Sequence, residues 1–174
     1  MGSMKFLVRG VTAVALEVGT GEAKAGLLFV SLSDSTIVSY DVSLGSAAAV
    51  KASRTVFASG SPLSAPEEMV FDSAGNMYTT NRNGNTVTKI TPSGTKSTFA
   101  SNIGSYGLTA DVAGNIYAAA GSVIKRIDQS GSVTTFANTN VSDSPRGLSF
   151  ETRGQQHNGR LRAFAREACK AIAA

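Results

Sequence analysis

Cysteine, histidine and aromatic residues are scarce in this 174-residue sequence, and the scarcity excludes several kinds of site. The single cysteine, Cys169, excludes a disulfide bond within the chain and gives no indication of the compartment in which the protein works. His157 is the only histidine, and there is no Gly-x-Ser-x-Gly motif, so a Ser-His-Asp triad is not expected. No apolar run approaches the length of a transmembrane helix, and no membrane partner is predicted.

Most of the chain also lacks an excess of charge. The formal net charge is +4, and the residues from Arg146 onward hold six Lys or Arg against two Glu, which accounts for the whole excess. The body before Arg146 is therefore formally neutral. A nucleic-acid partner would depend on the C-terminal tail alone, and we predict none.

The sequence does contain a run of short strand-like segments between residues 64 and 100. They read EEMVFD, NMYTTN, NTVTKIT and TKSTFA, and their Val, Thr, Tyr, Phe and Ile suit a pleated sheet. The connections are rich in Gly and Asn, which tolerate the positive φ of tight turns. This predicts a four-stranded antiparallel meander, which needs a neighbouring sheet to bury its apolar face.

Copies of this meander follow and precede it. The segment Asp72–Tyr78 recurs as Asp111–Tyr117, and the triplet Thr98-Phe99-Ala100 recurs at residues 135–137. A period of roughly forty residues with four strands per unit is typical of a β-propeller blade. Residues 27–58 complete a first blade, residues 106–137 form a third, and residues 145–151 match the first strand of a fourth unit. The predicted fold is therefore all-β.

The N-terminal residues allow two interpretations. Residues 1–3 are interpreted as a cloning remnant, and residues 4–25 have some features of a secretory signal. However, Arg9 and Glu17 interrupt the apolar run, whereas residues 13–17 align with residues 68–72. We therefore favour a strand at residues 13–17.

The repeat stops near residue 154, which we take as the end of the half-propeller that begins at residue 4. Residues 155–174 form a divergent basic tail in which Leu161, Phe164, Ala165 and Ala168 recur at helical spacing. This predicts an amphipathic helix from about Leu161, docked on the body. A helix that binds a membrane surface or a partner is the alternative.

Three blades and one strand do not make a closed ring, because propellers close with about four to eight blades. An open end would expose a large apolar face. We therefore predict a homodimer in which two chains of three blades close a six-bladed ring. An eight-unit ring is the alternative if each fourth unit contributes a partial blade.

Three motifs give the repeat a family resemblance: Ala65-Pro66-Glu67, the pattern Asp-x-x-Gly-Asn-Met-Tyr over residues 72–78, and Ile90–Thr95. The repeat resembles NHL-type β-propellers and their relatives, the regucalcin/gluconolactonase-like lactonases and the streptogramin lyases, over about residues 9–151. The resemblance is specific for fold and much less so for function.

The lactonases' pattern implies a divalent metal, Ca²⁺ above all, held in the central channel by residues just before the innermost strands. The matching positions in this chain are Thr12, Glu67, Tyr106 and Arg146, and only Glu67 is a plausible ligand. The streptogramin lyases use a His and Glu set, whereas His157 lies in the divergent tail. No organic cofactor is implied.

The candidate site is the channel mouth. Glu67 and Glu68 are the only paired carboxylates in the chain, and Asn81 comes from a loop on the same face. With both copies of a dimer, Glu67, Glu68 and Asn81 would offer oxygen ligands to a hard divalent ion. Glu67, Arg146 and Tyr106 are the candidate catalytic residues, although Arg146 could instead neutralise the acids and leave no metal.

Two functions from different classes remain open. The first is a metal-assisted hydrolase of lactones or activated esters and phosphotriesters, acting on a small-molecule substrate at a channel shared by two chains. The second is a non-catalytic propeller module that binds a peptide or glycan on its loop face, or a propeller fragment without an evolved function. The neutral body and the depleted ligand set favour the second, and the carboxylates at the channel mouth favour the first.

Overall fold

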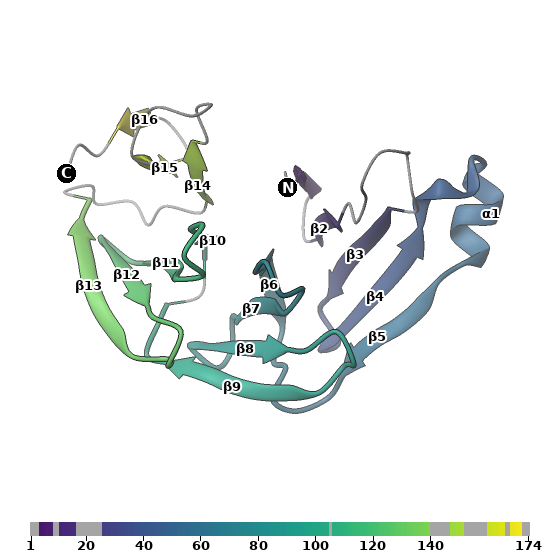
Figure 1. The fold of residues 1–174 in the computed structure, drawn as a ribbon, viewed down its shortest axis with the longest axis horizontal. Coiled ribbons are helices and arrows are strands. Elements are labelled where there is room, and N and C mark those ends of the chain that lie inside the picture. The colour runs from purple at the N-terminus through teal and green to yellow at the C-terminus, as the bar shows by residue number, and fades with distance from the viewer. Residues whose placement is uncertain are drawn as a thin grey trace.

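The protein is built from four antiparallel sheets that follow one another along an open arc, as a computed structural model shows (Figure 1). The structure describes residues 4–8, 11–16, 26–104, 106–139, 147–151, 160–165 and 168–171. In each sheet the strands lie in sequence order, so every connection within a sheet joins neighbouring strands. In the described part of the chain, no helix is long and apolar enough to cross a membrane.

The strands divide among the sheets in chain order. The first sheet contains β1 (Met4–Val8), β2 (Val11–Leu16), β3 (Leu27–Leu32), β4 (Thr36–Asp41) and β5 (Thr55–Ser59). The second contains β6 (Pro66–Phe71), β7 (Met77–Asn81), β8 (Thr86–Ile90) and β9 (Lys96–Ser101). The third contains β10 (Leu108–Ala110), β11 (Ile116–Ala120), β12 (Val123–Ile127) and β13 (Val133–Asn138). The fourth contains β14 (Gly147–Glu151), β15 (Arg160–Ala165) and β16 (Ala168–Ala171).

The strands predicted for the first three units are confirmed to within a residue or two. The strand expected at residues 13–17 is present as β2, and β1 is an additional strand that pairs with it. The enlarged connection between β4 and β5 contains a 3-10 turn, η1 (Val42–Leu44), and a short helix, α1 (Ala47–Ala52). Ser46 caps this helix by accepting a hydrogen bond from the Ala49 N–H at 3.2 Å.

The helix predicted from about Leu161 is wrong, because residues 160–165 and 168–171 are strands. The first four residues of the segment RLRAFA alternate between polar and apolar, so the segment suits a strand as well as a helix. Pairing with β14 favours the strand over the helix. The backbone groups of β14 need hydrogen-bond partners, and β15 supplies them along five register pairs. The fourth unit is therefore a three-stranded sheet instead of a single strand with a helical tail.

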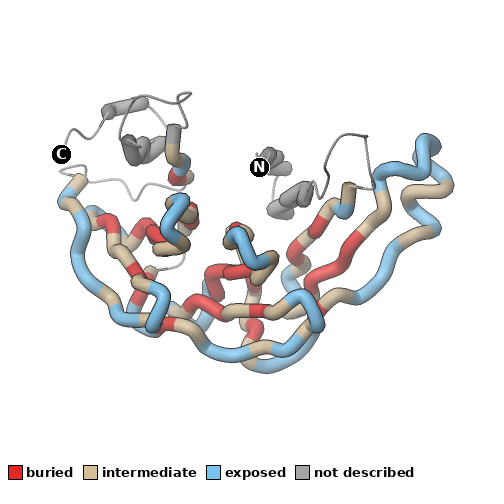
Figure 2. Tube along the Cα trace, in the orientation of Figure 1, coloured by how far each residue is buried: buried red, intermediate tan, exposed pale blue. Residues whose placement is uncertain are grey.

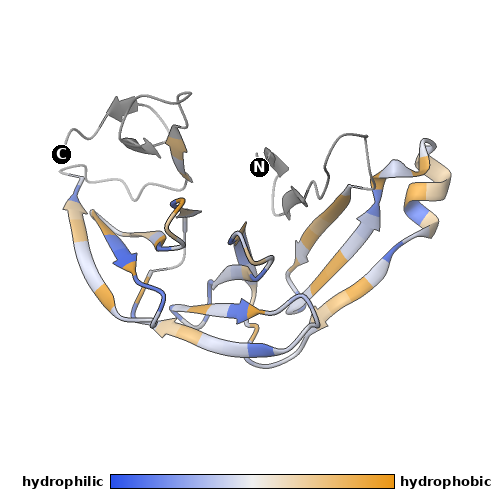
Figure 3. Ribbon diagram, in the orientation of Figure 1, coloured by the Kyte–Doolittle hydropathy of each residue, from blue (hydrophilic) through white to orange (hydrophobic). Residues whose placement is uncertain are grey.

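Three separate hydrophobic clusters fill the spaces between successive sheets. Phe29 of the first sheet contacts Phe71 of the second, with ring centroids 5.2 Å apart, and Tyr117 of the third contacts Phe150 of the fourth at 5.0 Å. Buried residues lie mostly in the inner strands of the second and third sheets, whereas β5, β9 and β13 are largely exposed along the convex side (Figure 2). Apolar and polar residues are interspersed along these outer strands (Figure 3).

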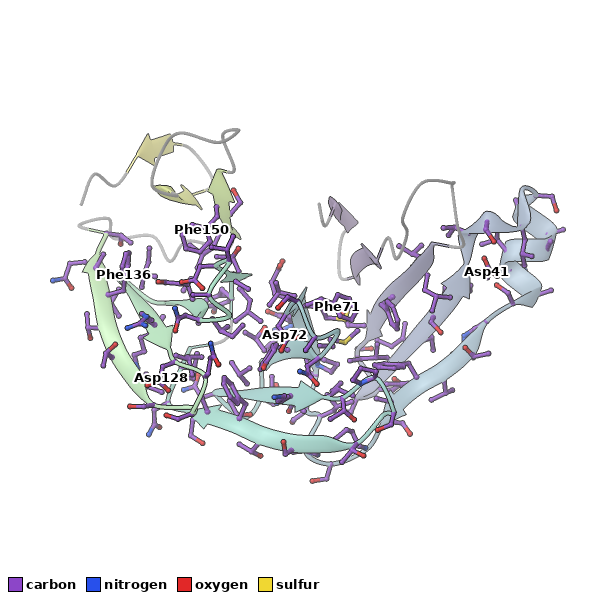
Figure 4. All side chains as sticks on the ribbon, viewed as in Figure 1. Asp41, Phe71, Asp72, Asp128, Phe136 and Phe150 are labelled. Carbon is purple, nitrogen blue, oxygen red and sulfur yellow. The ribbon has the colours of Figure 1, made fainter. Side chains whose placement is uncertain are left out.

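The motif that marks the repeat is a turn held by an aspartate. Asp72 Oδ1 accepts the backbone N–H groups of Ala74 and Asn76 at 2.9 and 2.8 Å, and Oδ2 accepts the Asn76 amide at 2.8 Å and the Tyr78 hydroxyl at 3.1 Å. Gly75 has φ +81°, a conformation that glycine adopts without strain. Asp111 makes the same four contacts in the third sheet. Asp72 therefore ties the β6–β7 turn to the core (Figure 4).

The burial and hydrogen bonds of this turn shift the pKa values of Asp72 and Tyr78. Burial alone would raise the pKa of Asp72, but the hydrogen bonds from Asn76, Tyr78 and Ala74 outweigh it and hold the pKa below its ordinary value. Burial and the negative charge of Asp72 together raise the pKa of the Tyr78 hydroxyl. Both shifts favour the pair in which the aspartate is ionised and the tyrosine is neutral.

Candidate functional site

The paired carboxylates lie on a β-bulge at the start of an innermost strand. Pro66 is in register with Asn81 and Met69 with Thr79, so Glu67 and Glu68 together oppose the single residue Thr80. The Glu68 N–H donates to the Thr80 hydroxyl at 3.2 Å in place of a ladder hydrogen bond. Bulges of this kind re-aim side chains and are common next to functional sites.

The residue before this strand adopts a strained backbone conformation. Ala65 has φ +50°, which is uncommon for a residue with a Cβ. Its N–H donates to the Ser35 hydroxyl at 3.2 Å, and its carbonyl accepts the Arg82 N–H at 3.1 Å. Loops from two sheets thus hold the chain in place just before Glu67, and such strain is concentrated at functional sites.

Glu67 forms an ion pair with Arg82, which follows β7 directly. Arg82 Nη1 lies 3.7 Å from Glu67 Oε1, and the side chains are 66% and 33% exposed. An exposed pair of this kind contributes only about 0.2–1 kcal/mol. The Glu67 carbonyl also accepts the Ser31 hydroxyl at 3.2 Å, which links the site to the first sheet. The backbone at Glu67 is therefore held in place, whereas the side-chain ion pair is weak enough to be exchanged.

Asn81 holds the surrounding loops together. Its side chain is fully buried, its amide donates to the hydroxyls of Thr86 at 2.9 Å and Thr88 at 2.8 Å, and its oxygen accepts the Ser64 N–H at 3.0 Å. Both amide protons are used, and the oxygen points to the backbone that leads into β6. Asn81 is therefore a structural residue and does not fit the predicted ligand set.

The structure places Tyr106 but not Arg146 among the other predicted residues. Tyr106 is half-buried and packs against the cluster between the third and fourth sheets, which contains Tyr117 and Leu148. Arg146 lies outside the described residues. The part of the chain with described side chains contains no group of three His, Cys, Asp or Glu that could hold a metal ion.

Arg82 was missed as the partner of Glu67, although a signal for it exists. Once EEMVFD and NMYTTN are paired as an antiparallel hairpin, Asn81 lies opposite Pro66 and Arg82 lies opposite Ala65, so Arg82 is a diagonal neighbour of Glu67. The register therefore predicts the contact, whereas the composition of the loop does not.

Comparison with known proteins gives the fold. No protein-family model and no curated protein matches the sequence. A streptogramin B lyase structure matches with a TM-score of 0.58 and 18% identity, covering 80% of this chain and 48% of that one. A protein of unknown function from Bacteroides thetaiotaomicron matches with 0.58 and 18%, covering 79% and 41%. Virginiamycin B lyase from Staphylococcus aureus matches with 0.56 and 17%, covering 88% and 53%.

The chain thus spans about half the length of the solved structures that it matches. Sequence identities below a fifth support a shared architecture but say nothing about a shared activity. The predicted resemblance is confirmed at this level: the chain has the β-propeller fold that it shares with the streptogramin and virginiamycin B lyases.

Proposed function

We propose that the loops around Glu67 form a non-catalytic surface that binds a peptide through its basic side chains. We call this surface the Glu67 rim and define it as residues 33–35, 64–68 and 81–85. The observation that carries the proposal is the partly exposed ion pair between Glu67, on the bulge, and Arg82. A lysine or arginine of a peptide can replace Arg82 as the partner of Glu67, because it offers the same charge-assisted hydrogen bonds.

The charge of the rim favours a basic peptide over a neutral glycan. The rim contains three carboxylates, those of Asp34, Glu67 and Glu68, against one guanidinium, that of Arg82. Opposite charge steers a partner to the surface and fixes its register. The excess is local, because the body of the chain before Arg146 is formally neutral.

The backbone of the rim is organised before a ligand arrives. The Asn83 N–H donates to the Ser64 carbonyl at 3.4 Å, the Arg82 N–H donates to the Ala65 carbonyl at 3.1 Å, and Asn81 joins the same segments through its side chain. A surface that is already ordered loses less conformational entropy when it binds. This supports recognition by the rim without a loop rearrangement.

Two substitutions of opposite effect test the proposal. Glu67→Gln should weaken binding of a Lys- and Arg-containing peptide about 5- to 30-fold, the cost of one interfacial charge pair. Arg82→Gln should strengthen it by about 2- to 5-fold, because it removes the competing cation. The assay is fluorescence polarisation with a library of labelled basic peptides. Lys51→Gln, which removes an exposed cation from α1, is the control and should change nothing.

A loss of binding in both Glu67→Gln and Arg82→Gln would show that the pair only supports the loop structure, and would contradict the proposal. Failure of every basic peptide to bind the wild-type protein would contradict it as well.

A metal-assisted hydrolase of lactones or activated esters and phosphotriesters is the second candidate, favoured by the position of Glu67 at the start of an innermost strand. In this candidate, two chains each contribute Glu67 to a shared channel site. Lactone and phosphotriester hydrolysis by the wild-type protein with added Ca²⁺, lost in Glu67→Gln, would replace the binding proposal with this one.

A further inference from the structure

Asn83 and Gly84 form an exposed Asn-Gly pair in the Glu67 rim, between β7 and β8. An asparagine followed by glycine is especially prone to deamidation, because glycine has no side chain to shield its backbone nitrogen from the asparagine amide carbon. Among the asparagines that the structure describes, only Asn83 is followed by glycine. The sequence therefore points to one peptide unit of the rim for this chemistry.

The backbone nitrogen of Gly84 makes a hydrogen bond that the turn can release. Its N–H donates to the Asn81 carbonyl at 3.2 Å, and the Asn85 N–H donates to the same carbonyl at 3.1 Å. When Gly84 turns away, the carbonyl therefore keeps a partner, and water satisfies the exposed N–H at little cost. The nitrogen thus becomes available as a nucleophile without unfolding of the sheet.

The chain on either side of this peptide unit stays anchored. The Asn83 N–H donates to the Ser64 carbonyl at 3.4 Å, and β8 begins at Thr86, two residues after Gly84. The opening that the reaction needs is therefore confined to the link between Asn83 and Gly84. A local opening of this kind costs far less free energy than global unfolding.

Other asparagines of the chain differ from Asn83 in their surroundings. Asn76 and Asn115 each donate the side-chain amide to the aspartate of their own turn at 2.8 Å. Asn85 is exposed like Asn83, but a threonine follows it, and the β-branched side chain of threonine crowds the backbone nitrogen. Asn85 is therefore a control for Asn83 within the same turn.

We propose that Asn83 is a site of spontaneous deamidation that adds a negative charge to the Glu67 rim. The Gly84 nitrogen loses its proton and attacks Asn83 Cγ, so that a bond forms between these two atoms. The Cγ–Nδ2 bond breaks, and the amide nitrogen leaves as ammonia. Water then opens the resulting succinimide ring at one carbonyl to give an aspartate, or at the other to give an isoaspartate. Both products carry a carboxylate, and water is the only other reactant.

The added carboxylate changes the charge of the rim. The rim contains the carboxylates of Asp34, Glu67 and Glu68 against the guanidinium of Arg82, and deamidation adds one more carboxylate to this excess. The consequence for binding rests on the proposed function, whereas the chemistry at Asn83 does not. A modified rim should bind a basic peptide about 1.5- to 5-fold more tightly, the effect of one exposed charge pair. The affinity of the rim then rises with the age of the protein.

Mass spectrometry of tryptic peptides, after incubation of the folded protein at mildly alkaline pH, tests the proposal. Trypsin cleaves after Arg82 and Lys89, so residues 83–89 form one peptide, and fragmentation distinguishes position 83 from position 85. The Asn-Gly pair at residues 158–159, outside the described residues, falls in a different peptide. Position 83 should convert about 2- to 13-fold more slowly than in a synthetic peptide of residues 79–89, because one hydrogen bond must open first. Position 85 should keep its amide over the same period.

Two substitutions at the same position complete the test. Asn83→Gln keeps the amide and the neutral charge but would have to close a larger ring, so it should abolish the conversion. Asn83→Asp carries the aspartate product from the start, and in the fluorescence polarisation assay it should bind basic peptides about 1.5- to 5-fold more tightly than Asn83→Gln. The mass measurement needs no peptide ligand, so its failure and the failure of the proposed function are distinguishable.

Three outcomes would overturn the inference or its consequence. An unchanged Asn83 in the folded protein, under conditions that convert the synthetic peptide, would show that the turn does not release the Gly84 nitrogen. Equal conversion at positions 83 and 85 would show that the glycine does not direct the reaction. Equal peptide affinities of Asn83→Asp and Asn83→Gln would show that the added charge has no effect on the rim.

Discussion

Removing the Asp72 carboxylate should destabilise the second sheet, because this group accepts four hydrogen bonds. In Asp72→Ala, the exposed N–H of Ala74 can turn to water at little cost. The Tyr78 hydroxyl cannot do so as easily, because Tyr78 is only 4% exposed. An unsatisfied buried donor costs about 1–3 kcal/mol, and the lost bonds to a charged acceptor raise the expected total to about 2–4 kcal/mol.

Urea denaturation followed by circular dichroism measures this loss. Asp128→Ala is the matched control, since Asp128 accepts three hydrogen bonds in a turn, but its donors, Ser130 and Ser132, are exposed. The loss of unfolding free energy in Asp128→Ala should be clearly smaller than that in Asp72→Ala. Tyr78→Phe should cost about 1 kcal/mol alone and much less in the Asp72→Ala background, because the two share one hydrogen bond. Equal losses for Asp72→Ala and Asp128→Ala would refute the argument that the buried Tyr78 hydroxyl sets the cost.

Two further predictions concern pH and a glycine. The folded-state pKa of Asp72 lies below its ordinary value, so its contribution to stability is present above about pH 4 and is lost as the pH falls through the folded-state pKa. Asp72→Asn should therefore flatten the dependence of the unfolding free energy on pH in that acid range. An unchanged slope would contradict this prediction. Gly131 has φ +88° and an added Cβ would lie 2.5 Å from the Phe99 carbonyl oxygen, whereas Gly121 has φ +64° and open space. Thermal unfolding should therefore show Gly121→Ala to cost about 1 kcal/mol and Gly131→Ala clearly more, and equal costs would rule out the clash.

The repeat made most of the fold predictable. Asp72–Tyr78 and Asp111–Tyr117 fix the same turn, so matching them places two sheets in register without any knowledge of their packing. The fourth unit carries no such motif after Glu151. Its strands depend on pairing with β14, a contact between distant residues, and the local pattern of residues 160–165 fits a helix equally well.

The candidate site was predictable only in part. The paired carboxylates of Glu67 and Glu68 are visible in the sequence, but the bulge that places both opposite Thr80 depends on strand register. Asn81 was expected as a ligand because of its loop position, yet its amide is used up within the hairpin by Thr86 and Thr88. Residue type and loop position do not reveal which hydrogen bonds a buried amide already makes.

The division of the core into three clusters has a consequence for how the chain responds to damage. Each cluster joins only adjacent sheets, so the protein behaves as a one-dimensional array in which stability is a sum of nearest-neighbour terms. The second and third sheets are each supported on both sides, whereas the first and fourth are supported by one cluster each. Unfolding of an end sheet therefore removes one interface and leaves the other sheets packed together. Unfolding of a middle sheet removes two interfaces and separates the sheets on its two sides.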